Sequence, residues 1–393
     1  MEKFLTKRNI QIGLIGLVIF AVSFTSSYFA FKNFGPQKST TGAPSAIREL
    51  DGQVVFDENL PKTEACPLNG QLYSKQQKDW WEKHRPLGIM IENHEETRPQ
   101  SGLSLADIVY EAVAEGGITR FLSIFYCEDA GIIGPIRSAR TYFLDYISEY
   151  GSSPLYVHVG GANQPGRADT LSQIDSYGWE GENDINQFSV GFPTFWRDYN
   201  RLGGATATEH TMYSTTQKLW EFSEKERGLS SEDSDGTHWS EDFVPYEFKD
   251  DAKVSERGGN QTVHVEFWSQ DSRYFADWKY DNVTNAYKRN TGGQAHLDKN
   301  TNKQITVKNV VSLFMQESRA NDGYPGNLHL LYRNKGSGRG VVFMDGKKID
   351  VTWRKSDRTG RTLLFDSKGS PIKFNKGKIW FSILPLEGEA DVR

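Results

Sequence analysis

An uncharged, apolar segment near the N-terminus, Ile10–Phe31, decides where the rest of this chain folds. It is long enough to span a bilayer as a helix, and Lys3, Lys7 and Arg8 precede it. The positive-inside rule predicts a cytoplasmic tip and a single signal-anchor helix in residues 1–31, with the remaining chain extracytoplasmic. A cleaved signal peptide is the alternative, but its apolar core is normally shorter, and no A-x-A-like site follows.

The part of the chain beyond this anchor is acidic. The 393 residues carry a formal net charge of −5, of which residues 1–31 contribute +2, so the remainder carries −7. Nucleic-acid binding needs a basic surface, and the charge therefore argues against a nucleic-acid partner. With 37% hydrophobic and 13% aromatic residues, the chain can bury a core, and its length favours two domains.

Composition divides this remainder into three parts. Residues 32–62 are punctuated by Pro, Ser, Thr and Gly, which predicts an extracytoplasmic linker. Strand-like and helix-like segments follow each other over residues 63–235, and they predict an α/β domain with a mixed α+β sheet. Strand-like runs divided by Asp-Gly and Lys-Gly turns predict a mainly β domain over residues 236–393.

The chain has two cysteines, Cys66 and Cys127, and both lie beyond the predicted anchor. Outside the membrane such a pair fits a disulfide, whereas two buried free thiols are the alternative. Neither cysteine has a partner at metal-ligand spacing, and no His/Cys/Asp cluster elsewhere has one. We therefore expect no metal and no cofactor.

Arg120 lies in a predicted β-hairpin whose turn is Gly116-Gly117. In a regular register, Glu111 and Glu115 are diagonal neighbours of Arg120 on one face of the hairpin. Arg120 therefore either binds an external anion or neutralises two glutamates of its own hairpin.

The stretch "GPIRSARTYFLDY" places Arg137 and Arg140 at the start of a helix predicted over residues 138–149, with Thr141 on the same face. A helix N-terminus is already electropositive, so two arginines there need a negative partner. This partner is either an anionic ligand or one of the protein's own carboxylates.

A second anion-binding pattern follows in "YVHVGGANQPG", which predicts a strand, a glycine turn and a helix N-terminus. Gly160 and Gly161 form the turn, and His158 alternates toward the same side; a hydrogen-bonded core histidine is the alternative. Glu209 and His210 form a candidate acid–base pair, which turn chemistry explains equally well. Ser214 and Gln217 predict a capping box for the next helix.

These stretches, with "IENHEETRPQSGLSLADIVYEAVAEGGITRFLSIF" and "TEHTMYS", resemble the N-terminal domain of the YerB-like bacterial envelope proteins. The run "GRGVVFMDGKKIDVTWRKSDRTGRTLLFDSKG" resembles the C-terminal domain of the same family. The resemblance implies an extracytoplasmic location and a two-domain protein of unknown function. Family members are often lipoproteins, but no cysteine ends the hydrophobic segment here, so the helix itself is the expected anchor.

In order along the chain, Arg120, Arg137, Arg140 and Gly160-Gly161 are also similar to positions of the LytR-CpsA-Psr envelope proteins. In that family, the arginines hold the pyrophosphate of a lipid carrier. The aspartates that accompany them are replaced here by Phe121 and Ser138, which argues against metal-assisted transfer.

The sequence thus predicts a membrane-anchored envelope protein that binds an anionic cell-wall glycopolymer, a lipid-linked ligand or an envelope partner. The alternatives are a phosphotransferase or hydrolase acting on lipid-linked or wall glycopolymers, and a structural scaffold that binds partner proteins. Only the enzyme needs acid–base groups such as Glu209 and His210.

Overall fold

The computed structural model describes residues 48–50, 52–204 and 206–393. The predicted membrane anchor, residues 1–31, lies outside the described residues. Within the described part, no helix is both long and apolar enough to cross a bilayer. Within the predicted linker, residues 32–62, Val54 is buried and donates its backbone N–H to Asp129 at 2.6 Å.

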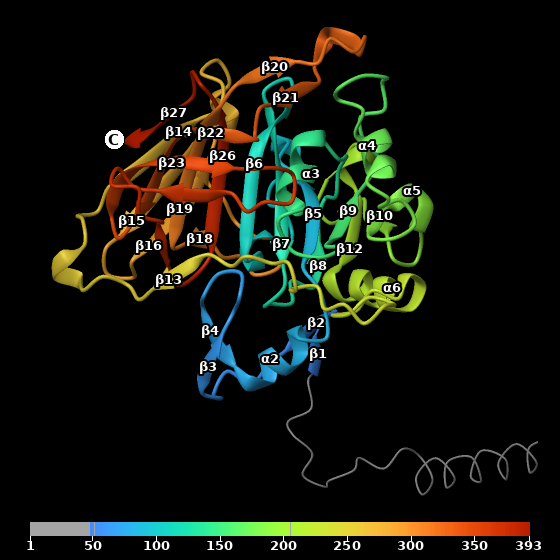
Figure 1. Cartoon of the computed structure of the whole chain (residues 1–393), viewed down its shortest axis with the longest axis horizontal. Helices are drawn as coiled ribbons and strands as arrows, with labels where there is room; N and C mark the ends of the chain where they lie inside the picture. The colour runs from blue at the N-terminus through green and yellow to red at the C-terminus, as the bar shows by residue number, and fades with distance from the viewer. Residues whose placement is uncertain (1–47, 51, 205) are drawn as a thin grey trace, which may run out of the picture. The chain divides into compact units, whose positions relative to one another are not determined.

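A ten-stranded sheet with parallel and antiparallel neighbours runs through the molecule (Figure 1). Its strands, in spatial order, are β10 (Asp184–Asn186), β9 (Leu155–His158), β5 (Leu87–Glu92), β7 (Ile118–Phe125), β6 (Ile108–Glu115), β26 (Ile379–Pro385), β19 (Asn309–Met315), β22 (Gly336–Met344), β23 (Lys347–Lys355) and β24 (Leu363–Phe365).

A second sheet comes entirely from the C-terminal part of the chain. Its strands are β17 (Gln294–Ala295), β16 (Ala286–Thr291), β15 (Ala276–Asp281), β14 (Thr262–Glu266) and β27 (Glu389–Val392), and β18 (Thr306–Val307) also pairs with β16. Smaller sheets contain β1 (Arg48–Leu50) with β2 (Gln53–Val55), β3 (Lys62–Ala65) with β4 (Leu72–Ser74), β11 (Trp196–Arg197) with β12 (Met212–Thr215) and β8 (Ile132–Ile133), β13 (Glu247–Lys249) with β25 (Lys373–Asn375), and β20 (Glu317–Arg319) with β21 (Leu330–Tyr332).

The helices are few and short. Those of the described residues are α2 (Lys75–Trp81), α3 (Thr141–Ile147), α4 (Thr170–Ser176), α5 (Gln187–Val190) and α6 (Thr216–Arg227). Single 3-10 turns occur at Glu95–Thr97, Leu103–Leu105, Thr208–His210, Val254–Glu256, Ser272–Tyr274 and Pro325–Asn327. Figure 1 shows α4, α5 and α6 gathered at the side of the large sheet that ends in β9 and β10. The fold is therefore mixed α+β, with much sheet and few helices.

The two regions expected to form separate domains share the large sheet. Strand β6 from the N-terminal region pairs in parallel with β26 from the C-terminal region, with Ile108 opposite Ile379. The described α-helices all precede residue 228, and the two regions meet through backbone hydrogen bonds rather than through a linker. The boundary between residues 235 and 236 stays a prediction.

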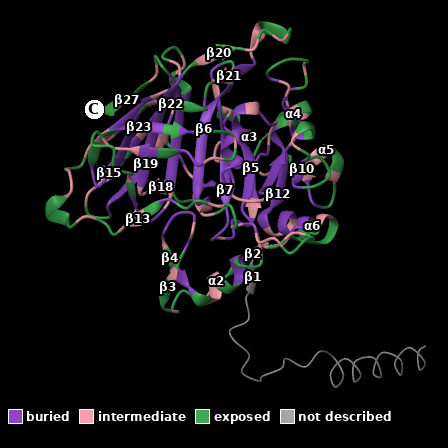
Figure 2. Ribbon diagram, in the orientation of Figure 1, coloured by how far each residue is buried: buried purple, intermediate pink, exposed green. Residues whose placement is uncertain are grey.

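The large sheet is covered on both faces at this junction, and its central strands are buried (Figure 2). On one face, the ring of Tyr110 stacks on Tyr146 of α3 at 4.6 Å and on Phe381 of β26 at 4.8 Å. On the other face, Glu111 meets Arg289 of β16. The alternation of side chains along β6 thus sends one residue into each layer of the core.

The β6–β7 hairpin turns where the sequence predicted, but a β-bulge shifts its register between Val113 and Glu115. Arg120 is therefore opposite Ala112, and Glu111 points to the other face of the sheet. The prediction that both Glu111 and Glu115 flank Arg120 is wrong for Glu111. One extra residue in one strand is sufficient to reverse the side on which Glu111 lies.

Helix α6 begins one residue later than the predicted capping box placed it. Its N-cap is Thr215, whose hydroxyl accepts the backbone N–H of Lys218 at 3.1 Å. Ser214 instead belongs to β12, and its hydroxyl donates to the carbonyl of Thr194 at 2.7 Å. The Ser214–Gln217 box is therefore wrong, because the preceding strand uses the serine for its own contacts.

Cys66 and Cys127 form a disulfide, so the first of the two alternatives for the cysteines is confirmed. Both residues are buried, and the bridge ties the segment before β4 to the end of β7. Beside it lies Asp107, whose carboxylate accepts the backbone N–H groups of Tyr126 and Cys127 at 2.8 and 3.0 Å. Burial nevertheless raises the pKa of Asp107 to about 7.

Asp107 gives a prediction for pH dependence. Because burial raises the pKa of Asp107 from its ordinary value of 3.8 to about 7, folding favours the protonated form. Its stabilising contribution is complete below the unfolded pKa and is lost as the pH rises through the folded pKa, with a slope of up to about 1.4 kcal/mol per pH unit. Between pH 5 and pH 8 the free energy of unfolding of the wild type should therefore fall relative to that of Asp107→Asn, with roughly this slope.

Urea unfolding of both proteins at several pH values checks this expectation. The amide variant has an unfavourable offset, because Asn69 donates its side-chain amide to Asp107 at 2.6 Å, but that offset does not depend on pH. Parallel stability curves for the two proteins would contradict a raised pKa at Asp107.

Candidate functional site

The stretch from Arg137 to Ala139 is extended and lies between β5 and the glycine turn after β9. The Arg137 N–H donates to Met90 O at 2.9 Å, and the Arg137 carbonyl accepts the N–H of Val159 at 3.0 Å. The Ala139 N–H donates to Gly160 O at 2.9 Å. Because these backbone groups are used between strands, the helix predicted from residue 138 begins only at residue 141, and Arg137 precedes it. The backbone segments that contain Arg137 and Gly160 therefore lie side by side.

Arg120 and Arg140 share one carboxylate, that of Glu115. An Nη of Arg120 lies 3.3 Å from Glu115, and Arg140 forms a short contact with the other carboxylate oxygen. Arg120 also donates to Ser138 O at 3.0 Å, and Arg140 donates to Ala139 O at 2.6 Å. Although burial alone would raise the pKa of Glu115, the two guanidinium groups hold it well below its usual range. These two arginines therefore mainly neutralise and brace their own hairpin.

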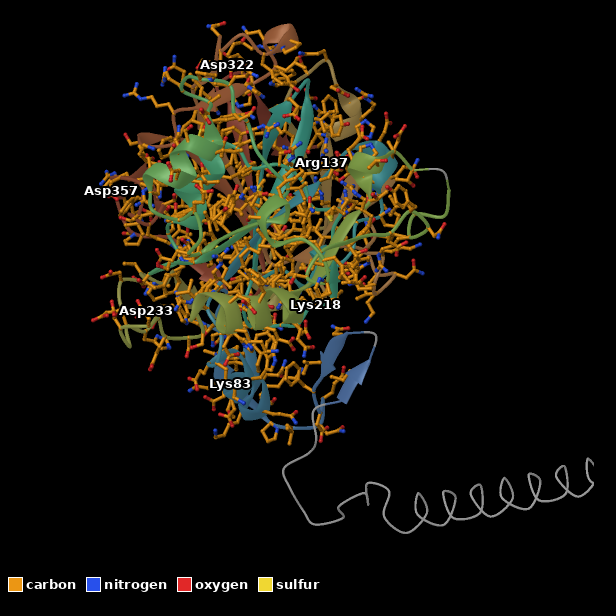
Figure 3. All side chains as sticks on the ribbon, turned by 90° about the vertical axis from the view of Figure 1, so that its right-hand side faces the viewer. Lys83, Arg137, Lys218, Asp233, Asp322 and Asp357 are labelled. Carbon is orange, nitrogen blue, oxygen red and sulfur yellow. A yellow bond between two sulfur atoms is a disulfide. The ribbon has the colours of Figure 1, made fainter. Side chains whose placement is uncertain are left out.

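Arg137 differs from these two arginines. Its Nε lies 3.2 Å from Glu92, and its side chain is 24% exposed. Among the described residues, its terminal nitrogens have no hydrogen-bond partner, whereas those of Arg120 and Arg140 do. Burial lowers the pKa of Arg137, and the charges of Arg120 and Arg140 add to this against the opposing effect of Glu92. Figure 3 shows the molecule from the side that carries β9 and β10, with Arg137 labelled.

His158 is a core residue, as the alternative to a ligand role predicted. It is fully buried, with Nδ1 2.7 Å from Gly160 O and Nε2 2.6 Å from the carboxylate of Asp184. Both ring nitrogens are thus used to hold the glycine turn against β10. Gly160 has φ +60°, and a Cβ there would lie 3.0 Å from the ring of Phe188. The turn therefore needs glycine for its shape, and Gly161 lies beside Ala139 in a parallel bridge.

Thr141 lines a cavity of about 470 Å³ between α3 and the β20–β21 hairpin, and Arg137 is not among the residues that line it. In the structure Arg137 and Arg140 both precede α3. The prediction that Arg137, Arg140 and Thr141 share one helix face is therefore wrong, since only Thr141 belongs to the helix. The cavity is lined by residues of both sequence regions, among them Arg167, Arg333 and Lys335. Lys335 pairs with Asp145 at 2.6 Å, and Arg167 and Arg333 are exposed.

His210 is paired with Glu92 and not with its sequence neighbour Glu209. The Nδ1 of His210 lies 2.8 Å from Glu92 Oε2, and this hydrogen bond raises the pKa of His210. Glu209 is exposed, and a backbone hydrogen bond lowers its pKa. The Glu209–His210 acid–base pair is therefore not formed as the sequence suggested.

Three residues that were not among the predicted site residues complete this region: Glu92 at the end of β5, and His94 and Glu96 in the loop after it. The rings of His94 and His210 stack at 4.9 Å, and Glu96 Oε2 lies 3.6 Å from His210 Nε2. One potential ligand atom from each of His94, Glu96 and His210 lies within 4.8 Å of the other two. The dense run "ENHEE" directly after a buried strand was the signal for this cluster.

Comparison with known proteins identifies the relatives of this fold. Residues 70–230 match the family model described as the N-terminal domain of a protein of unknown function, DUF3048, and residues 262–381 match the C-terminal domain of the same family. The chain belongs to the DUF3048 family. The matched segments contain Arg120, Arg137, His210 and the cysteine Cys127, whereas Cys66 lies just outside.

This chain is also similar to a protein of Bacillus subtilis (strain 168) described as the putative lipoprotein YerB. It is 28% identical to this chain over 312 residues, which cover 77% of this chain and 82% of YerB. The crystal structure of the YerB protein from Bacillus subtilis superposes with a TM-score of 0.66 at 25% identity. That match covers 84% of this chain and all of the solved one, so the mixed α+β fold is shared.

Proposed function

We propose that this protein is an extracytoplasmic envelope protein, anchored by its N-terminal segment, that binds an anionic ligand through Arg137. The relative's description as a putative lipoprotein supports an envelope location. The disulfide supports an oxidising compartment, because such bridges persist mainly outside the cytosol. The apolar segment Ile10–Phe31 would supply the anchor in place of a lipid.

The observation that carries the ligand proposal is the unused donor capacity of Arg137. Three guanidinium groups, of Arg120, Arg137 and Arg140, face two carboxylates, of Glu92 and Glu115. Arg137 is the member of this set whose side chain is partly exposed and whose terminal nitrogens lack hydrogen-bond partners among the described residues. An arginine fork presents parallel N–H donors that match phosphate and carboxylate oxygens. A phosphate or carboxylate group of a wall polymer or lipid-linked precursor has this chemistry.

Thermal unfolding of the full chain with inorganic pyrophosphate tests the proposal. EDTA is present throughout, and sodium chloride at matched ionic strength is the reference. A ligand at 100 times its Kd stabilises the native state by about 2.7 kcal/mol, so we expect the Tm of the wild type to rise. Arg137→Ala should lose this rise, and Arg137→Lys should keep only part of it, because one ammonium replaces the planar fork.

Arg333→Ala is the matched control, since Arg333 is an exposed arginine of the cavity beside α3. This variant should keep the full rise in Tm. If Arg333→Ala loses the rise and Arg137→Ala keeps it, the anion binds in the cavity and the assignment to Arg137 is wrong. Equal rises in all variants would remove the proposed site altogether.

A further inference from the structure

The cluster of His94, Glu96 and His210 joins two segments that are more than a hundred residues apart. His94 and Glu96 lie in the loop that follows β5, and His210 ends the 3-10 turn Thr208–His210. His210 is buried, the side chain of His94 is 24% exposed, and that of Glu96 is 66% exposed. The cluster thus has a fixed inner member and two members at the surface.

Glu92 fixes the orientation of His210. Its carboxylate lies 2.8 Å from His210 Nδ1, so this nitrogen carries the proton and donates it to the carboxylate. The lone pair of the neutral ring is then on Nε2, which faces Glu96 at 3.6 Å. A histidine whose second nitrogen donates to a buried carboxylate is the usual arrangement of a metal-ligating imidazole. Glu92 is itself held, because its other oxygen lies 3.2 Å from Arg137 Nε.

The spacing of the three groups is close to that of a tetrahedral site. Zinc bonds of about 2.0–2.1 Å place neighbouring ligand atoms about 3.4 Å apart. The distance from His210 Nε2 to Glu96 Oε2 is 3.6 Å, and that from His94 Nδ1 to Glu96 Oε2 is 4.0 Å. Closing the site requires the stacked His94 ring to rotate and its Nδ1 to release the backbone N–H of Glu96, which it accepts at 3.3 Å, while the exposed Glu96 side chain moves inward.

We propose that His94, Glu96 and His210 bind a zinc ion, and that Glu92 acts as a positioning residue for His210. Two imidazole nitrogens and one carboxylate oxygen suit Zn²⁺, whereas Mg²⁺ and Ca²⁺ prefer all-oxygen sites. The exposure of Glu96 leaves a fourth position open to solvent. This proposal does not depend on anion binding by Arg137, and it replaces the expectation from sequence spacing that the chain holds no metal.

Zinc titration of the full chain tests the site. The chain is produced without a polyhistidine tag, stripped with EDTA and exchanged into buffer without phosphate or reductant, so that Cys66 and Cys127 stay bridged and supply no thiolate. Competition with a chromogenic chelator measures affinity. We expect one Zn²⁺ per chain, with His94→Ala and Glu96→Gln each weakening binding by at least about 10-fold. Mg²⁺ should not compete.

Glu95→Gln is the matched control for Glu96→Gln, because Glu95 is the adjacent carboxylate and pairs with Arg273 at 2.9 Å. His238→Ala, at a partly exposed histidine outside the cluster, is the control for His94→Ala. Both controls should bind zinc as the wild type does. Substituting Co²⁺ should give the visible absorption of a tetrahedral site in the wild type and not in His94→Ala.

Glu96→Gln changes an exposed side chain, so an unaltered Tm without metal is expected. His94→Ala also removes the hydrogen bond from the backbone N–H of Glu96 and the ring contact with His210, so a small fall in Tm with one cooperative transition is expected and shows that the fold is kept. Absence of saturable zinc binding by the wild type would overturn the proposal. Wild-type zinc affinity in both His94→Ala and Glu96→Gln would overturn it equally, since the metal would then be held elsewhere.

Discussion

Glu111→Gln is expected to destabilise the protein by about 3–5 kcal/mol, because it leaves a buried guanidinium without its counter-charge. The side chains of Glu111 and Arg289 are both 0% exposed and lie 2.9 Å apart. Glu111 also accepts hydrogen bonds from Thr119 and from the indole of Trp380, both at 2.9 Å. Glutamine keeps the shape but only one accepting oxygen, so its amide NH2 faces one of the present donors and the substitution removes a buried hydrogen bond together with the charge.

Aromatic rings do not replace that charge. The guanidinium of Arg289 lies 4.4 Å from the ring centre of Trp380 and 5.1 Å from that of Trp278. Such cation–π contacts contribute about 2 kcal/mol when desolvated, less than the cost of an isolated buried cation. Since Glu111 and Arg289 come from β6 and β16, the loss should affect the contact between the two sequence regions.

Urea unfolding measures the effect, and Glu247→Gln is the control. Glu247 pairs with Lys373 at 2.8 Å, but both side chains are more than half exposed, so its loss should cost about 0–1 kcal/mol. A similar small loss for Glu111→Gln would mean that Arg289 is solvated in the folded protein. Two separate unfolding transitions in the variant would show that the two regions can unfold independently.

The position of Glu111 also shows where prediction from sequence ended. Residue patterning located β9 and the turn of the β6–β7 hairpin, because alternation and glycine turns are local properties. The bulge between Val113 and Glu115 has no comparable signal, yet it moves Glu111 to the opposite face of the sheet. The single sheet across both regions was equally invisible, since the pairing of β6 with β26 joins residues about 270 positions apart.

The candidate site was predicted in part for the same reason. Arg137 and Gly160, which belong to two separate anion-binding patterns in the sequence, lie on adjacent segments in the structure. The partner of Arg137, Glu92, was missed, because it belongs to the end of a strand that reads as core. His210 was assigned to Glu209, its neighbour in sequence, whereas its contact in space is 118 residues away. Local spacing finds pairs on one element and not those that tertiary packing creates.

Removing the disulfide is the second change with a large expected effect. The bridge joins residues separated by 61 positions, and closing a loop of this length lowers the entropy of the unfolded chain by an amount worth about 4 kcal/mol. Cys66→Ala/Cys127→Ala should therefore lose about 4 kcal/mol in urea unfolding under oxidising conditions. Alanine is chosen because both positions are buried and a serine hydroxyl would need a new partner there.

Reductant separates the effect of the bridge from that of the two side chains. The wild type with reductant should approach the stability of Cys66→Ala/Cys127→Ala, whereas reductant should leave the double variant unchanged. Alkylation of the unfolded wild type without reductant should add no mass, because both sulfurs are bonded to each other. The addition of two alkyl groups would instead show that both thiols are free. The disulfide would then no longer support an oxidising compartment.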